Sequence, residues 1–273
     1  MKIVSNKLVT EAGDKPVSFV NSPNQSGVIT PKYLIIHYTA GRSAKSSIEW
    51  FMNPQAQASA HLVIGPDGSI TQLVPFNKRA FHAGKSKWAG LDGLNSHSIG
   101  IELDNPGKLK KTGSKWLAWF GAEYPENKVL IATHKHQHEP AGWHIYTEAQ
   151  IEACIKVSQV IVKHYKLLEI LGHEDISPLR KEDPGPAFPM ESFKSKILGR
   201  ENDTEELFKV NTAGTNLRTG PGTGFVSMGK LSKGVKVEFV QSNMGWFNVV
   251  LAQRVAGITE PEGWVHNSLL TKI

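Results

Sequence analysis

The stretch Gly172–Phe188, GHEDISPLRKEDPGPAF, follows an apolar run and places His173 directly after the glycine that ends it. Its prolines fix φ and restrict the residues before them, which predicts a stiff and largely non-helical loop. Such a loop can hold His173, Lys181 and Asp183 in one place. An imidazole and a carboxylate are suitable zinc ligands, and an ammonium suits a site where negative charge develops. Two ligands do not make a metal site, and an ordinary charged turn explains this stretch almost as well.

Two apolar stretches upstream predict strands that carry polar side chains. Tyr33–Ile36 is a continuous apolar run, typical of a strand buried on both faces, and His37 follows at its end. A histidine at the end of a rigid strand is well placed to bind a ligand beyond the sheet edge. Ser98–Leu103 is a second predicted strand, with Glu102 between two apolar residues. Alternation more often turns such a carboxylate to solvent than into a cleft.

Further polar candidates lie between these strands. His61 falls in the first strand of a predicted hairpin over residues 60–74, where it either lines a cleft or is a satisfied core histidine. Residues 81–97 indicate a loop over a polar site, because they carry three such side chains among glycines: His82, Trp88 and Asn95.

Residues 106–140 form a predicted insertion. Its first part, 106–128, is polar and combines lysines with Trp116 and Trp119, a composition that suits either contact with a polymer or a solvated loop. In an extended chain, three alternating histidines near its end would share one side. A second metal site is therefore conceivable there, although Glu139 is the single clear carboxylate nearby. The three are His134, His136 and His138.

The chain divides into two predicted domains. A capping-box pattern at Thr147 opens a helix whose apolar stripe continues to Leu168, and its alternation with the strands indicates an α/β domain. We place this domain at residues 1–198 and a polar linker at 199–206. Residues 207–273 contain short strand-like runs between glycine-rich turns, which predicts a small all-β barrel.

Composition describes a globular protein suited to anionic partners. Of its 273 residues 40% are hydrophobic and 21% charged, and the net charge is +6. That charge suits nucleic acid, anionic lipid or bacterial wall polymers without choosing among them. The lone Cys154 excludes an intramolecular disulfide framework and a cysteine zinc cluster. No apolar run approaches the ~18 residues of a membrane span, and the N-terminus shows no evident Sec signal.

Three stretches in this order carry a family resemblance: His37-Tyr38-Thr39, Ser98–Glu102 and Gly172–Pro186. Over about residues 28–195 the chain resembles the zinc-dependent N-acetylmuramoyl-L-alanine amidases of the type 2 family, which are related to the peptidoglycan recognition proteins. The tail independently resembles a bacterial SH3 domain, through Asn216–Gly222 and Gly263-Trp264-Val265.

The resemblance implies an α/β fold with a mixed central sheet flanked by helices, joined to a small all-β SH3-like barrel. Three protein ligands would hold one Zn²⁺ and leave the fourth tetrahedral position for water, as in catalytic zinc sites. The substrate would be peptidoglycan, cut at the amide between N-acetylmuramic acid and L-alanine, and the SH3-like domain would target the cell wall. The implied metal ligands are His37, His173 and Asp183, the catalytic residues Glu102 and Lys181, and the substrate-binding candidates His61, His82, Trp88 and Asn95.

Two alternatives stay open at this point. A cytosolic amidase that recycles soluble anhydro-muropeptides is favoured by the missing signal and disfavoured by the SH3-like tail. A non-catalytic muropeptide receptor is disfavoured because all the implied ligands and catalytic residues are present. We expect a monomer with no nucleic-acid partner, which acts on the bacterial cell wall in the periplasm or outside the cell by an export route that the sequence does not identify.

Overall fold

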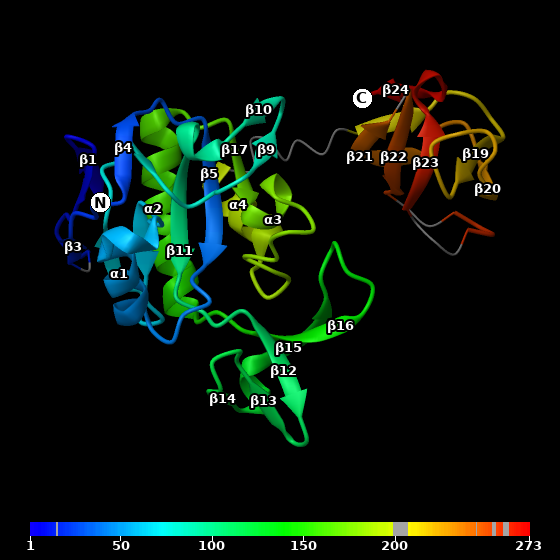
Figure 1. The fold of residues 1–273 in the computed structure, drawn as a ribbon. Helices are drawn as coiled ribbons and strands as arrows, with labels where there is room; N and C mark the ends of the chain where they lie inside the picture. Colours follow the sequence, from blue (N-terminus) through cyan, green and yellow to red (C-terminus); the bar gives the residue numbers. More distant parts are fainter. Residues whose placement is uncertain (15, 199–206, 244, 253–254, 259–261) are drawn as a thin grey trace. The chain divides into compact units, whose positions relative to one another are not determined.

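The computed structural model describes residues 1–14, 16–198, 207–243, 245–252, 255–258 and 262–273. The chain forms two compact units, Met1–Ile197 and Leu198–Ile273 (Figure 1). Each is described by itself below. The predicted linker at 199–206 lies outside the described residues.

A six-stranded sheet forms the centre of the first unit. Its strands in spatial order are β17 (Glu169–Gly172), β5 (Tyr33–Tyr38), β11 (Ser98–Leu103), β6 (Leu62–Ile64), β7 (Ile70–Gln72) and β3 (Val17–Phe19). The first four run parallel to one another, β6 and β7 form an antiparallel hairpin, and β3 is parallel to β7. β5 and β11 are buried almost throughout, as parallel strands covered on both faces must be. The predicted strands and hairpin are thus confirmed, and β5 continues through His37.

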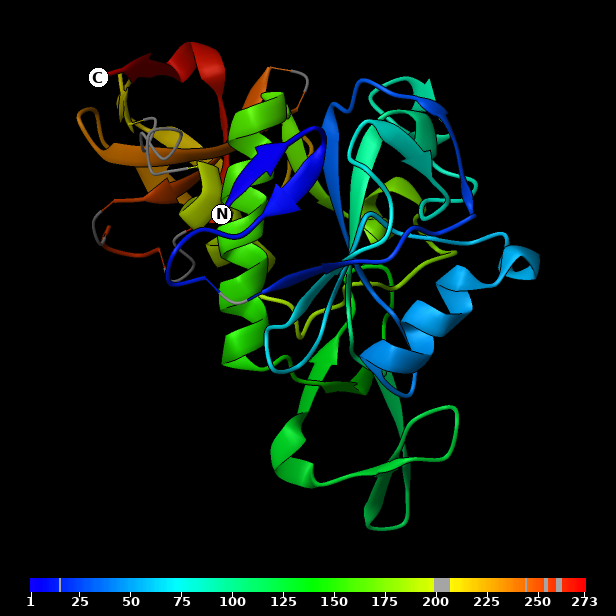
Figure 2. The same cartoon turned by 90° about the vertical axis from the view of Figure 1, so that its left-hand side faces the viewer.

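Helices cover both faces of this sheet, which confirms the predicted α/β fold. Figure 2 shows α2 (Glu148–Tyr165) and α1 (Ala44–Met52) on opposite sides of the central strands. The Thr147 side chain caps α2 by accepting a hydrogen bond from the Gln150 amide, and the buried stripe of the helix includes Cys154. On the other face, Phe51 of α1 packs in an apolar cluster with Val63. Two shorter helices follow β17: α3 (His173–Ile176) and α4 (Met190–Leu198).

The insertion folds as a separate antiparallel sheet, so the solvated loop considered for residues 106–128 is wrong. In spatial order its strands are β14 (Glu123–Tyr124), β13 (Lys115–Leu117), β12 (Lys108–Thr112), β16 (Pro140–His144) and β15 (Val129–Thr133). Leu109, between two lysines, and Trp116, which follows Lys115, are buried and pack with Ala118 in a small core. These strands bury one face and expose the other. The average composition of the segment is polar and does not reveal the buried face.

Short elements complete the first unit. Its remaining strand pairs are β1 (Lys2–Val4) with β2 (Lys7–Val9), β4 (Gln25–Val28) with β8 (Lys78–Ala80), and β9 (Lys87–Trp88) with β10 (Leu91–Asp92). Single 3₁₀ turns occupy Pro54–Ala56, Leu94–Ser96 and Glu126–Lys128. Across the described residues, none of the helices combines the length and the apolar character that a membrane crossing requires.

The second unit is a seven-stranded antiparallel sheet around an apolar core. Its strands in spatial order are β20 (Ser227–Leu231), β19 (Thr215–Arg218), β23 (Glu262–His266), β22 (Trp246–Leu251), β21 (Lys236–Asn243), β18 (Leu207–Val210) and β24 (Leu270–Lys272), with a 3₁₀ turn at Asn267–Leu269. Among the described residues of this unit, the buried core is aliphatic apart from Phe208. Trp246 and Trp264 are only half-buried and do not belong to this core.

Candidate active site

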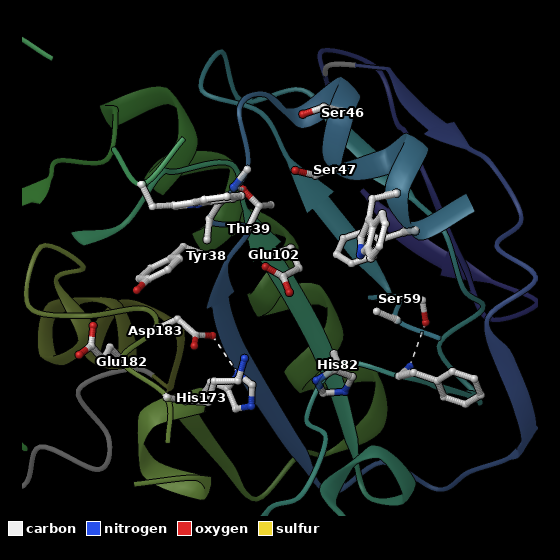
Figure 3. Close-up of a pocket in the computed structure, with 18 of the residues that line it drawn as sticks. Tyr38, Thr39, Ser46, Ser47, Ser59, His82, Glu102, His173, Glu182 and Asp183 are labelled. Carbon is white, nitrogen blue, oxygen red and sulfur yellow. Dashed lines mark hydrogen bonds and ion pairs between the residues drawn. The ribbon is translucent and has the colours of Figure 1, made fainter. Parts of the chain in front are cut away.

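Strand register places His37 and Glu102 side by side. β5 and β11 are parallel, and Glu102 is paired with His37. Because side chains alternate along a strand, both residues project from the same face of the sheet. Glu102 is only 8% exposed and lines a cavity (Figure 3), so it does not take the solvent-facing position that alternation favours. The reason is that every residue of β11 is buried, which leaves the strand no solvent face.

The loop after β17 brings two further side chains to the same edge of the sheet. Gly172 is paired with Ile36 of the parallel strand β5, so His173 begins beside His37. His173 opens the one-turn helix α3, and the loop then returns, with the Glu174 amide donating to the Asp183 carbonyl at 2.9 Å. The stretch that predicted a stiff loop therefore holds both side chains, although it contains one helical turn that the prolines did not indicate.

Three potential ligand atoms converge at this edge. His37 Nδ1 lies 3.0 Å from His173 Nδ1 and 2.9 Å from Asp183 Oδ2, and His173 Nδ1 lies 3.0 Å from the same oxygen. All three side chains are buried. Within the described ranges of the chain, this is the one cluster of three side chains that could hold a metal ion.

A hydrogen-bond relay defines the tautomer of His37. The hydroxyl of Ser98 donates to the Leu94 carbonyl at 2.6 Å, so its oxygen accepts from His82 Nε2 at 3.3 Å. His82 Nδ1 is then an acceptor, and His37 Nε2 donates to it at 3.0 Å. The proton of His37 is therefore on Nε2, and its Nδ1 presents a lone pair to the cluster. Burial, followed by the nearby His173, lowers the pKa of His37 to about 4, which keeps the ring neutral.

A main-chain carbonyl defines the tautomer of His173 in the same way. His173 Nε2 lies 3.1 Å from the Ala83 carbonyl oxygen, which can only accept, so Nε2 carries the proton. His173 Nδ1 therefore presents a second lone pair beside the Asp183 carboxylate.

This donor set fits a divalent metal ion. Two lone pairs and a carboxylate oxygen facing one another in a buried site repel each other unless a cation lies between them. A tetrahedral centre with bonds of about 2.1 Å separates its ligands by about 3.4 Å, close to the separations found here. Neutral imidazoles whose other nitrogen donates to a fixed acceptor are also typical metal ligands.

Glu102 is a buried carboxylate with an unused oxygen. Burial raises its pKa to about 8; the charge of Asp183 adds to this shift and that of Lys181 opposes it. Its Oε2 has no hydrogen-bond partner among the described residues. Lys181 lines the same cavity of about 690 Å³, together with His173 and Asp183. A carboxylate with a strongly shifted pKa in a cleft is typical of a functional site.

The substrate-binding candidates divide into one that lines the cavity and three that do not. His82 lines it and also contacts His37. Asn95 lies behind His82, where its side-chain oxygen accepts from the amides of His82 and Ala83 and so fixes their loop. Trp88 donates to Glu169 at 2.8 Å and packs in an apolar cluster with Tyr33. Asn95 and Trp88 therefore have structural roles here.

His61 is a satisfied core histidine, so its assignment as a substrate-binding residue is corrected. Its side chain is fully buried, with Nδ1 accepting from the Gly100 amide at 3.0 Å and Nε2 donating to the Lys78 carbonyl at 2.9 Å. Burial lowers its pKa to about 4. Both nitrogens are used by the main chain, which leaves none for a substrate.

The alternating histidines of the insertion do not form a second metal site. They follow β15 in a turn rather than in an extended strand, and only the rings of His134 and His136 are neighbours, with centroids 5.5 Å apart. His134 is buried and pairs through Nε2 with Glu174 Oε2 at 2.6 Å, whereas His136 contacts the Glu174 carbonyl and His138 is exposed. Because Glu174 follows His173, this contact fastens the insertion to the loop that carries two of the three candidate metal ligands.

Three contributors were not predicted as site residues. Ser98 begins the relay that reaches His37 through His82. It lies on the same face of β11 as Gly100 and Glu102, which follow it by two and four residues. That alternation is the signal that could have identified it. Gly100 belongs to the same arrangement, since a Cβ there would lie 2.5 Å from the His82 ring. Trp119 of the insertion also lines the cavity, although its sequence segment indicated only general contact with a polymer.

Comparison with known proteins agrees with this geometry. Residues 27–186 match the N-acetylmuramoyl-L-alanine amidase family, and residues 213–271 match the bacterial SH3 domain. The N-acetylmuramoyl-L-alanine amidase AmiD of Escherichia coli (strain K12) is 34% identical over 185 residues, which cover 64% of this chain and 56% of that protein. The 1,6-anhydro-N-acetylmuramyl-L-alanine amidase AmpD of Enterobacter cloacae is 34% identical over 149 residues, which cover 54% of this chain and 60% of that protein.

A solved structure supports the fold. The crystal structure of a selenomethionine derivative of AmpD superimposes with a TM-score of 0.50 at 26% identity, covering 72% of this chain and 99% of the other. The chain thus spans a little over half the length of the two curated relatives above and nearly all of this solved chain. The family match alone covers more than half of the chain. With a bacterial SH3 domain in its second unit, the chain belongs to the N-acetylmuramoyl-L-alanine amidase family.

Proposed function

We propose that the chain is a zinc-dependent hydrolase that cleaves the amide bond between N-acetylmuramic acid and L-alanine in peptidoglycan. The observation that carries this proposal is the convergence of two imidazole lone pairs and a carboxylate beside the unpartnered oxygen of Glu102. The family match and the names of the relatives support the substrate class.

His37, His173 and Asp183 are the residues that would hold zinc. Two nitrogens and one oxygen are a common ligand set for this ion, and three protein ligands leave a fourth position open. When bound, zinc supplies a Lewis acid that polarises a carbonyl oxygen and lowers the pKa of water. The residues of the relay, His82 and Ser98, would keep the His37 lone pair directed at the other two ligands.

Glu102 and Lys181 would carry out the proton transfer and charge stabilisation. Glu102 takes a proton from the attacking water and returns it to the leaving amine of L-alanine. Its high pKa in the metal-free protein falls when positive charge enters the site, which makes the carboxylate form available as a base. Lys181 lines the cavity, and its ammonium would stabilise the tetrahedral oxyanion that develops there.

The second unit would hold the enzyme on its polymer. Phe225 is 48% exposed, and Trp246 and Trp264 are half-buried, so aromatic surface is available for binding. A binding domain tethered to a catalytic domain raises the local substrate concentration without changing the chemical step.

A second candidate is an amidase for soluble anhydro-muropeptides. The AmpD relatives, which are named for that activity, favour it. The SH3 domain disfavours it, because a small soluble substrate needs no second anchor. Comparing the rate on intact sacculi with the rate on soluble anhydro-muropeptides separates the two.

Mass spectrometry of digested peptidoglycan tests the proposed bond. The zinc-loaded protein should release free stem peptides that begin with L-alanine, together with glycan strands that keep the lactyl carboxylate. A digest in which every stem peptide stays attached to its sugar would refute the proposal.

A further inference from the structure

The insertion contacts both ends of the loop 173–183, which begins at His173 and ends at Asp183. One contact is at Glu174, the residue after His173, and the other is at Glu182, the residue before Asp183. The loop contains one helical turn, α3, and its residues 177–183 lie outside helices and strands. Contacts with side chains from elsewhere in the domain therefore help to fix its shape.

Glu174 is buried and joins the two ends of the loop to the insertion. Its amide donates to the Asp183 carbonyl at 2.9 Å, and its Oε2 accepts from the Gly185 amide at 3.2 Å. His134 Nε2 donates to the same oxygen at 2.6 Å, and Lys135 Nζ lies 2.9 Å from Oε1. Because a buried carboxylate is costly unless it is paired and hydrogen-bonded, these partners allow Glu174 to hold the loop closed.

The insertion holds the His134 donor in one position. His134 Nδ1 accepts from the His136 amide at 3.1 Å, so Nε2 carries the proton that it donates to Glu174. The ring stacks on Trp143 of β16, with centroids 5.6 Å apart. Trp143 Nε1 in turn donates to the Ala132 carbonyl of β15 at 3.0 Å. The donor to Glu174 is thus fixed by two strands of the insertion sheet.

The same tryptophan packs against the chain that follows the loop. Gly185 has a φ of +70°, and a Cβ there would lie 2.9 Å from the Trp143 ring. Glycine suits both the backbone angle and the close approach. Tyr146, two residues after β16, donates its hydroxyl to the Pro184 carbonyl at 2.8 Å. These contacts hold the main chain directly after the Asp183 carboxylate.

Glu182 provides the second polar contact with the insertion. Its Oε1 accepts from Gln137 Nε2 and from Lys108 Nζ, the latter at 3.3 Å. Lys108 also donates to Gln137 at 2.9 Å. Figure 3 shows Glu182 on the side of Asp183 away from Glu102. The insertion therefore contacts the outer side of the segment that directs Asp183 into the site.

We propose that the insertion positions the loop 173–183 for metal binding, with Glu174 as the positioning residue through which it acts. Without a metal, the facing lone pairs of His37 and His173 and the Asp183 carboxylate repel one another and favour an open loop. Contacts that keep the loop closed raise the fraction of protein that is ready to bind, and the apparent affinity rises in proportion. The inference rests on the proposed function for the identity of the ion.

The zinc affinity of the full chain, measured by chelator competition, tests this role. His134→Ala removes the donor to Glu174 and should weaken zinc binding about tenfold, which corresponds to a loop closed about one tenth of the time. His134→Gln, whose amide can donate from a similar position, should restore most of the affinity. His144→Ala is the matched control and should bind zinc as the wild type does. His144 lies in β16 of the same sheet, where its ring stands edge-on to Tyr124 at 4.6 Å.

A spectrum separates positioning from a loss of stability. Both histidine-to-alanine variants are expected to lower the free energy of unfolding, so this quantity alone does not decide. The visible spectrum of the Co²⁺-loaded chain depends on ligand geometry. His134→Ala should change this spectrum, and His144→Ala should leave it unchanged. Lower stability of His134→Ala with the zinc affinity and the Co²⁺ spectrum of the wild type would overturn the proposal.

Hydrogen exchange in the metal-free chain tests the closed loop without any reaction. The amides of Glu174 and Gly185 donate within the loop, so they should exchange faster in His134→Ala and at the wild-type rate in His134→Gln and His144→Ala. Equal exchange in all four proteins would contradict the proposal. If the wild type binds zinc and releases no peptide from peptidoglycan, the proposed function fails, whereas the exchange and affinity measurements still judge the role of Glu174.

Discussion

Replacing Glu102 by glutamine should stabilise the metal-free protein, and the gain should grow with pH. Burial raises the pKa of Glu102 from an ordinary 4.5 to about 8, so the folded protein binds this proton more tightly than the unfolded chain does. The stability that results is complete below pH 4.5 and is lost as the pH rises through 8. Glutamine keeps the shape of the side chain and cannot ionise, so the variant escapes this loss.

The magnitude follows from the two pKa values. Above pH 8 the ionised carboxylate costs the folded state up to about 5 kcal/mol, whereas at pH 5 the cost is below about 1 kcal/mol. The free energy by which Glu102→Gln stabilises the folded protein should therefore be about 4 kcal/mol larger at pH 9 than at pH 5.

Urea unfolding with a chelator present, at pH 5 and pH 9, measures this difference. Histidines that titrate in both proteins cancel when the variant is compared with the wild type at the same pH. A difference in unfolding free energy that is the same at both pH values would show that Glu102 is not a buried, unpartnered carboxylate. With zinc bound, the same variant should keep its metal and lose orders of magnitude in turnover, because the base is gone.

Four further substitutions or deletions examine the other parts of the site. Asp183→Ala should weaken zinc binding, measured by chelator competition, by more than about 100-fold. Losses of up to about 100-fold are typical when a residue that only hydrogen-bonds a metal ligand is removed. Unchanged affinity would show that Asp183 is not a ligand. His82→Leu should weaken zinc binding by about 10–100-fold because His37 loses its acceptor, and an affinity equal to that of the wild type would argue against the relay. Lys181→Ala should lower kcat by about 100–1,000-fold at equal zinc content, and a near-normal rate would exclude an oxyanion role. Deleting residues 207–273 should leave cleavage of a soluble muropeptide almost unchanged and reduce pull-down with sacculi; loss of soluble activity in folded, zinc-loaded protein would place part of the active site in the second unit.

Local patterns in the sequence predict the central strands and the long helix because burial on both faces demands apolar runs. Tyr33–Ile36 and the capped helix after Thr147 show this directly. The family resemblance then selects the three metal-ligating candidates, which the structure brings within hydrogen-bonding distance of one another.

Sequence patterns fail where the answer depends on neighbours distant in the chain. His61 and His82 look alike as isolated histidines, yet one is held by two main-chain groups and the other contacts His37. The position of Glu102 depends on whether β11 is covered, which its own residues do not reveal. The insertion was misjudged because its lysines dominate its composition, whereas the buried Leu109 and Trp116 determine its fold.

Stoichiometric activation by zinc would establish that His37, His173 and Asp183 form a catalytic metal site. Protein stripped of metal is titrated with zinc while release of L-alanine-terminated peptide from peptidoglycan is recorded. We expect no activity without metal, a linear rise to one zinc per chain, and no rise for Asp183→Ala over the same range. Full activity in metal-free protein, or a wild-type rise that Asp183→Ala reproduces, would contradict this assignment.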